Sequence, residues 1–146
     1  MAHLRIVGPD EGETLQIGSA VRMRVLEDGS TTDHRLGVAE GMLAPRSAGP
    51  PQHRHARHDE SFYVLAGLVR FTVGADRYDA GPSTLVIVPP GVPHTFANPG
   101  DEPARLLSTF TPGDYAHYFR ELRDTAPDQL EELMARYDTV ITEEAP

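Results

Sequence analysis

Residues 49–67 read GPPQHRHARHDESFYVLAG, and this stretch carries an unusual set of metal-binding side chains. His53 and His55 are two residues apart, so an extended backbone turns both imidazoles toward the same side. Glu60, Phe62 and Val64 occupy alternate positions of the next predicted strand, so their side chains point to the same face. The carboxylate of Glu60 is therefore directed toward the apolar side of that strand. An unpaired buried carboxylate is costly, and the usual remedies are a counter-charge or a metal ion. We therefore expect these residues to contribute to a metal site.

Residues 81–98, GPSTLVIVPPGVPHTFAN, supply a third imidazole. Pro90 and Gly91 suit the central positions of a type II turn, in which glycine takes the positive φ, and His94 follows this turn. Three imidazoles and one carboxylate suit a first-row divalent metal, and iron, manganese, nickel, copper and zinc all remain open. The alternative is a set of solvated loop histidines, which requires the His53/His55 pair, Glu60 and His94 to be placed by coincidence.

These residues resemble the two sequence motifs of the cupin superfamily. The first motif, His-x-His-x4-Glu-x6-Gly, is filled by His53, His55, Glu60 and Gly67. The second motif, Pro-x-Gly-x2-His-x3-Asn, is filled by Pro89, Gly91, His94 and Asn98. The resemblance spans residues 38–110 and implies a small β-barrel that holds a metal ion between the two motifs.

The chain departs from the family pattern at two loop glycines. Three residues separate Gly49 from His53, and seven separate Gly81 from Pro89, where the family has five in each case. Because neither glycine is a ligand, these departures concern the turns and leave the metal site in place.

The resemblance implies chemistry like that of quercetin-dioxygenase-like cupins or of cupin polyketide cyclases. In the first type, a substrate enol or phenol binds the metal as its anion and dioxygen attacks the activated ring, with Glu60 as ligand or proton acceptor. In the second type, the metal polarises a carbonyl while Glu60 or His58 removes an acidic α-proton. We expect a metal-dependent enzyme that acts on a small phenolic, enolic or polyketide-like molecule. Of the two reactions, we favour the dioxygenase type over the cyclase type. A cupin that binds a small molecule without turnover is the remaining alternative.

His58 lies between His55 and Glu60, so it is a competing candidate ligand. Glu60 occupies the matching motif position and has apolar neighbours, which places His58 beside the site or in solvent. Candidate residues of a substrate pocket are the aromatic neighbours of the ligands, two aromatic residues of the C-terminal segment and one loop arginine that suits an anionic oxygen: Phe62, Phe96, Tyr115, Phe119 and Arg46.

The rest of the chain predicts an all-β fold, an antiparallel barrel or sandwich followed by one or two helices, and the resemblance implies that this is a cupin-type β-barrel or jelly roll. Short runs with strand character, separated by turn signals, are residues 4–7, 20–26, 35–43, 68–73, 77–80, 84–88 and 104–110, the run 84–88 being continuously apolar as in a buried strand. Helical spacing of apolar residues appears in 115–123 and 127–137. We expect one domain over residues 1–146, with the barrel in about 20–110 and the helical segment in about 114–137.

The composition restricts the partners. The net charge of −9 argues against nucleic acid and anionic membranes, because phosphates are bound by clustered basic residues. No signal peptide or membrane span is recognisable and cysteine is absent, so we expect a cytoplasmic protein without disulfides. The apolar run Leu4–Val7 is nearly free of charge and predicts an edge strand that pairs with a second copy in a homodimer.

Overall fold

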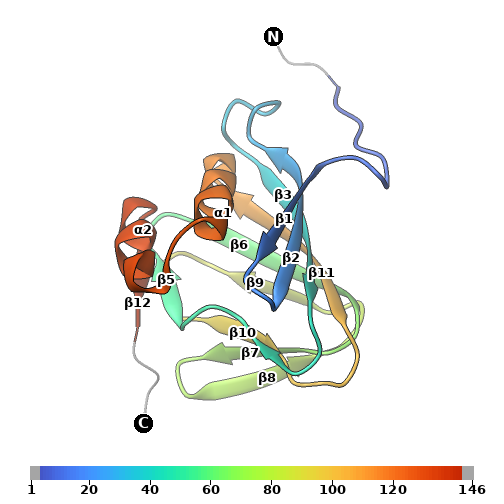
Figure 1. The fold of residues 1–146 in the computed structure, drawn as a ribbon, viewed down its shortest axis with the longest axis vertical. Coiled ribbons are helices and arrows are strands. Elements are labelled where there is room, and N and C mark those ends of the chain that lie inside the picture. The colour runs from blue at the N-terminus through green and yellow to red at the C-terminus, as the bar shows by residue number, and fades with distance from the viewer. Residues whose placement is uncertain (1–3, 143–146) are drawn as a thin grey trace.

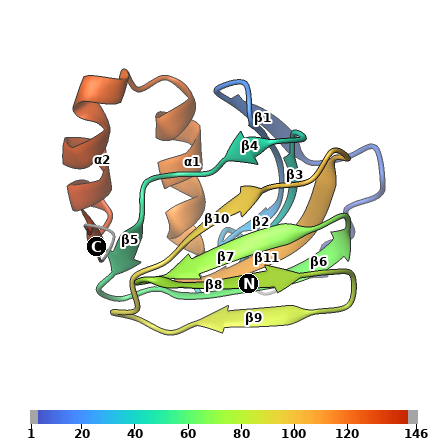
Figure 2. The ribbon, with the colours of Figure 1, turned by 90° about the horizontal axis from the view of Figure 1, so that it is seen from below.

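The computed structural model describes residues 4–142, which form two facing antiparallel sheets with two short helices at one end (Figures 1 and 2). The larger sheet has six strands, in the spatial order β1 (Glu13–Ile17), β2 (Val21–Asp28), β3 (Gly37–Leu43), β11 (Ala104–Thr111), β6 (Asp59–Ala66) and β9 (Leu85–Val88). The smaller sheet has four, in the order β4 (Ser47–Ala48), β10 (Thr95–Asn98), β7 (Val69–Val73) and β8 (Asp76–Ala80). The expected all-β jelly roll is confirmed, although the two sheets do not close into one barrel.

A third, two-stranded sheet pairs β5 (His53–His55) with β12 (Thr139–Ile141). Two helices stand between β11 and β12 in the sequence: α1 (Ala116–Arg123) and α2 (Leu130–Arg136), each preceded by a 3-10 turn. The chain therefore returns from the helices to the strand that carries two of the candidate ligands. Sequence analysis did not predict β12, because its pairing with β5 spans more than eighty residues and three residues carry little pattern.

The side chains inside the molecule form two clusters. One fills the space between the sheets and includes Phe62, Val64 and Phe71. The other lies between the larger sheet and the helices and includes Leu15, Phe110 and Leu133. The alternation in β6 buries Glu60 together with Phe62 and Val64, as its parity predicts.

An ionic contact ties α1 to the larger sheet. The guanidinium of Arg120 donates to Glu13 Oε1 over 2.6 Å and to Asp28 Oδ2 over 2.9 Å. The Arg120 hydrogen bond, followed by that of Ser30, lowers the pKa of Asp28 well below its usual range. These contacts hold the inner face of α1 against the end of the sandwich, where it completes a cavity described below.

Two predicted strands need correction. Residues 4–7 belong to no sheet of this chain, and Leu4 and Ile6 are 85% and 79% exposed, while the expected pairing with a second copy stays a prediction. Residues 84–88 do contain β9, but Leu85 and Ile87 point outward and only Val88 is buried. The apolar run reflects an edge strand whose outer face is apolar, rather than a strand buried on both faces.

None of the helices within residues 4–142 is long and apolar enough to cross a membrane.

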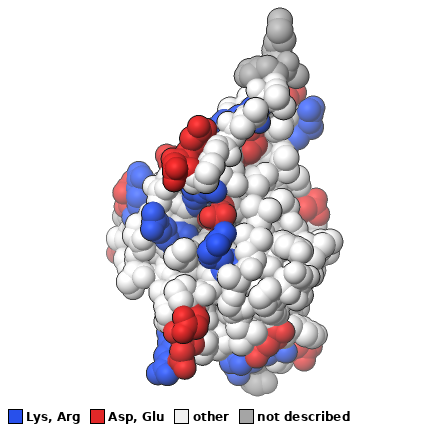
Figure 3. All heavy atoms as spheres, turned by 90° about the vertical axis from the view of Figure 1, so that its right-hand side faces the viewer, with Lys and Arg blue, Asp and Glu red and all other residues white. Residues whose placement is uncertain are grey.

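We propose that the protein is a homodimer. β9 is an edge of the larger sheet and is therefore free to pair on one side, while its outward Leu85 and Ile87 are 55% and 64% exposed. Tyr63 is the partner of Leu85 in the register of β6 and β9 and extends this apolar surface. Figure 3 shows a broad uncharged area on one face of the molecule. An apolar edge of this kind is usually covered by another chain.

Light scattering at micromolar concentration is expected to give twice the 16.0 kDa of one chain. Ile87→Glu should produce the monomer, because it places a charge in the apolar contact, whereas Tyr78→Glu on β8 of the smaller sheet should leave the dimer intact. A wild-type mass near that of one chain would reject the dimer.

Candidate metal centre

Backbone pairing brings the two motifs together. His53 and His94 form an isolated antiparallel bridge, with hydrogen bonds of 3.0 and 2.8 Å between their backbone groups. Gly91 has a φ of +85° and donates its N–H to the backbone oxygen of His55 over 2.7 Å. The Val92 N–H donates to Pro89 O across this turn, as the predicted type II turn requires. The Pro90-Gly91 turn thus attaches the second motif directly to β5.

The four candidate ligands converge in a buried space. One ligand atom from each of His53, His55, Glu60 and His94 can be chosen so that all four lie within 4.8 Å of one another. Glu60 Oε2 is 3.0 Å from His94 Nε2 and 3.2 Å from His55 Nε2. All four residues are at most 8% exposed. The arrangement excludes the alternative in which these histidines are solvated loop residues.

Hydrogen bonds behind the cluster fix the orientation of the three imidazoles. Nδ1 of His53 lies 2.7 Å from Pro51 O, and Nδ1 of His94 lies 2.9 Å from Val92 O. A carbonyl oxygen only accepts, so in both rings Nδ1 carries the proton and Nε2 presents a lone pair to the cluster.

His55 obtains the same orientation from β12. Its Nδ1 lies 2.7 Å from Thr139 Oγ1, and the Thr139 hydroxyl donates to Tyr137 O over 3.0 Å. Because the hydroxyl proton is engaged, the Thr139 oxygen accepts from Nδ1–H of His55. His55 Nε2 is buried and has no well-aligned hydrogen-bond partner among residues 4–142, although Glu60 lies nearby.

The protonation states complete a set of electron-pair donors. Burial acts to raise the pKa of Glu60, and this carboxylate stays ionised only where imidazole N–H donors, or a cation in their place, offset the burial. Burial, with the neighbouring imidazole of His94, lowers the pKa of His53 to about 4. A carboxylate and imidazole lone pairs therefore face one another away from water, which is unfavourable unless a cation lies among them. The donor set fits a divalent transition metal of open identity.

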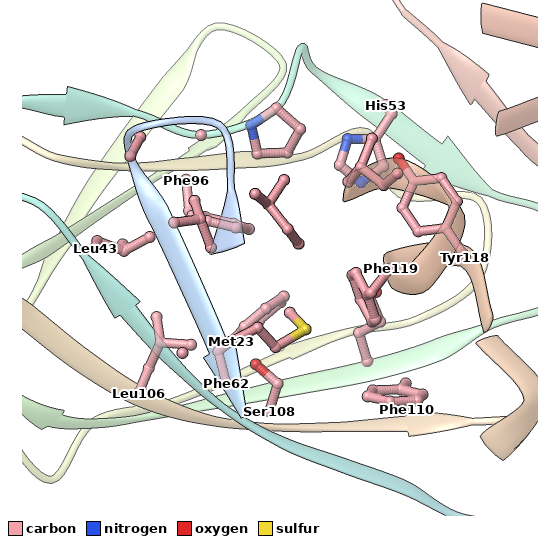
Figure 4. A pocket seen from close by; sticks show the side chains of 18 of the residues that line it. Met23, Leu43, His53, Phe62, Phe96, Leu106, Ser108, Phe110, Tyr118 and Phe119 are labelled. Atoms are coloured by element: carbon pink, nitrogen blue, oxygen red, sulfur yellow. The ribbon is translucent and has the colours of Figure 1, made fainter. Parts of the chain in front are cut away.

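A cavity of about 320 Å³ adjoins the cluster (Figure 4). His53 and Glu60 contribute to its wall, and most of the remainder is apolar. The apolar wall is formed mainly by Met23, Leu43, Phe62, Phe96, Leu106, Phe110 and Phe119. Among the described lining residues, Glu60 is the sole carboxylate, and no arginine is present. The cavity thus suits an uncharged or weakly acidic apolar molecule.

Four of the five predicted pocket residues lie on this wall: Phe62, Phe96, Tyr115 and Phe119. Arg46 does not. Its φ is +51° and its guanidinium makes an exposed ion pair with Asp101 at 2.6 Å, which holds the side chain at the surface. In this structure Arg46 therefore lies outside the cavity lining, paired with Asp101 at the surface.

His58 is neither a member of the four-residue cluster nor a lining residue of the cavity. It is buried, with its ring centroid 4.2 Å from that of Tyr115 and 5.0 Å from that of His55. Burial, followed by the imidazole of His55, lowers the pKa of His58 to about 4. His58 thus lies beside the metal ligands, as one of the two sequence-based alternatives proposed, and it is not solvated. Its position away from the cavity makes Glu60 the better placed proton acceptor.

Sequence reasoning missed Tyr118 and Thr139. The sequence analysis names Tyr115 and Phe119 as pocket candidates, and Tyr118 and Leu122 of the same helical segment line the cavity with them. The signal was present in the density of aromatic residues on one face of α1. Nothing in the local sequence marks Thr139, whose role depends on the pairing of β12 with β5.

Thr139→Val is expected to weaken metal binding roughly 10- to 100-fold, the usual effect of losing a hydrogen bond behind a metal-binding histidine. Valine has nearly the same shape but cannot accept from His55 Nδ1–H. Thr139→Ser keeps the hydroxyl and serves as the matched control. Chelator competition with zinc measures both affinities. Equal affinities of wild type and Thr139→Val, or an equal loss in Thr139→Ser, would contradict this role.

Comparison with known proteins agrees with the motifs and the fold. Residues 39–110 match the family model described as Cupin domain. An uncharacterized protein of Methanocaldococcus jannaschii is 27% identical over 111 residues, covering 70% of this chain and 88% of the relative. The polyketide cyclase RemF of Streptomyces resistomycificus has a TM-score of 0.66 and 20% identity, with 75% of this chain and 80% of that chain covered.

A sugar phosphate isomerase of the cupin superfamily from Silicibacter pomeroyi has a TM-score of 0.65 and 24% identity, with 73% of this chain and 75% of that chain covered. These two structural likenesses show a shared fold. The family match and the two filled motifs show that residues 39–110 of this chain are a cupin domain.

Proposed function

We propose that the protein is a metal-dependent enzyme that oxidises a small phenolic, enolic or polyketide-like molecule with dioxygen. The observation that supports this most is the apolar, aromatic-walled cavity that adjoins the histidine and glutamate cluster. The family relationship supports a small-molecule enzyme, because structural neighbours include a cyclase and an isomerase.

The cavity wall selects the substrate. Phosphate recognition normally relies on arginine or lysine, and none of the described lining residues is an arginine or a lysine. A sugar phosphate therefore finds no arginine or lysine to bind it in this cavity, in spite of the likeness to a sugar phosphate isomerase. A planar ring, in contrast, gains from burial against Phe62, Phe96 and Phe119.

Each protein group has a distinct part in the reaction. His53, His55, Glu60 and His94 would hold the metal, which when bound supplies Lewis acidity that favours the ionised form of a substrate enol or phenol. The carboxylate of Glu60 lines the cavity, so it is placed to accept the proton that the substrate hydroxyl releases. The apolar wall excludes water and fixes the plane of the ring.

The oxidation needs no other cofactor. Both atoms of dioxygen enter the organic product and the substrate supplies all four electrons, so the reaction requires neither a nicotinamide nor a flavin. A polyketide cyclase reaction at the same site would proceed without oxygen, and a binding protein would leave the ligand unchanged. Oxygen consumption therefore separates the three alternatives.

The test uses apoprotein loaded separately with iron(II), manganese(II), nickel(II), copper(II) and zinc(II). We expect oxygen uptake with a flavonol for at least one of the redox-active metals, and none with a sugar phosphate. His94→Ala should lose metal and oxygen uptake while keeping its circular dichroism spectrum, because the two apolar clusters do not depend on this ligand. His117→Ala, at an exposed position of α1, is the control that should keep both.

Three results would contradict the proposal. Conversion of a polyketide-like compound without oxygen uptake would favour the cyclase. Binding of the flavonol without turnover under every metal would favour the binding protein. Unfolding of His94→Ala would show that residue 94 supports the structure itself.

A further inference from the structure

We propose that Tyr118 donates a hydrogen bond to the substrate oxygen that lies at the metal centre. This inference deepens the proposed function and rests on it, since it names the residue that recognises the oxygen. Tyr118 lies on α1, is 4% exposed and lines the cavity. Figure 4 shows its hydroxyl directed toward the His53 end of the cavity, where the ligand cluster lies.

The hydroxyl of Tyr118 has no hydrogen-bond partner among residues 4–142. Tyr118 as a residue is buried and its hydroxyl lies at the wall of a mostly apolar cavity, so this donor gains from an acceptor on a ligand. The neighbouring tyrosines are engaged: the Tyr137 hydroxyl donates to Glu121, and the Tyr115 hydroxyl interacts with Thr139. Of these three tyrosines, Tyr118 therefore carries the donor that is left for a ligand in the cavity.

The ring of Tyr118 is held in place by other aromatic rings. It stacks on Tyr115, with centroids 4.9 Å apart and planes 13° apart. It also makes edge contacts with Phe119 at 5.4 Å and with Tyr137 at 5.5 Å. A donor fixed on three sides loses little conformational freedom when it binds a ligand, which is the property of a prebuilt recognition group.

The hydroxyl stays protonated and is a permanent donor. Burial, followed by the negative charge of Glu60, raises the pKa of Tyr118 well above its usual range. Tyr118 cannot then act as a base near neutral pH, and its complement is an acceptor oxygen. Glu60 supplies the opposite function, because its carboxylate only accepts.

In the resulting site, the substrate oxygen is contacted from two sides. The metal ligands present the metal to one side, Tyr118 donates from another, and Phe62 and Phe96 contact the attached ring. This predicts selectivity for flat aromatic molecules that carry an enol, phenol or conjugated carbonyl oxygen at the buried end. A hydrocarbon of the same size has the ring contacts but lacks the polar match.

The experiment compares two probes on zinc-loaded protein, which binds without redox turnover. The first probe is 3-hydroxyflavone, which carries the acceptor oxygens. The second is 2-phenylnaphthalene, a flat hydrocarbon without oxygen. Dissociation constants are measured by probe fluorescence, with zinc content checked in each sample. The variants are Tyr118→Phe and, as matched control, Tyr137→Phe, whose hydroxyl contacts Glu121.

Tyr118→Phe is expected to weaken 3-hydroxyflavone binding about tenfold, the size of one hydrogen bond to an ionised oxygen. Its binding of 2-phenylnaphthalene and its zinc content should stay unchanged, and Tyr137→Phe should resemble wild type with both probes. Equal effects of Tyr118→Phe on the two probes, or no effect on either, would overturn the inference and leave the proposed function standing.

Other results would contradict the proposed function without contradicting the role of Tyr118, or would contradict both. If wild type binds 3-hydroxyflavone through Tyr118 but consumes no oxygen under any metal, the inference about Tyr118 holds and the oxidation is wrong. If wild type binds neither probe, the cavity is not the substrate site and both proposals fall together.

Discussion

Four electron-pair donors directed at one another in a buried space are the constraint on which this structure depends. The Nδ1 groups of His53, His55 and His94 are occupied by Pro51, Thr139 and Val92, so the three Nε2 atoms face the carboxylate of Glu60. Lone pairs and negative charge held together without water repel one another. A bound cation turns that repulsion into attraction, and this is why we regard the cluster as a metal site rather than a polar patch in the core.

The fold meets this constraint by placing β5 at the junction of three elements. The Pro90-Gly91 turn attaches to one side of β5 through Gly91, and β12 pairs with the other side through Thr139. The C-terminal segment therefore has two consequences for the site. β12 orients a ligand, while α1 supplies aromatic residues to the cavity next to the metal. The same C-terminal segment therefore contributes to both the metal centre and the pocket.

Much of the fold and the ligand set could be predicted from the sequence, because both depend on local patterns. Parity within β6 indicates that Glu60 points inward, and the turn before His94 follows from Pro90 and Gly91. The features that could not be predicted depend on pairing between strands far apart in the sequence, or on which of several nearby groups a charged side chain binds. Thr139 contacts His55 only because β12 pairs with β5. Arg46 lies at the surface, where it pairs with Asp101. The segment 4–7 has strand composition, but no edge of its own chain receives it.

The central claim is that one divalent metal ion lies among these four side chains. A crystal structure of metal-loaded protein, with anomalous diffraction data collected on both sides of the absorption edge of the added metal, tests it most directly. Our account predicts a single strong anomalous peak bonded to Nε2 of the three histidines and to the Glu60 carboxylate. A peak at another place, or an imidazole of His53, His55 or His94 turned away to solvent in the loaded protein, would contradict it.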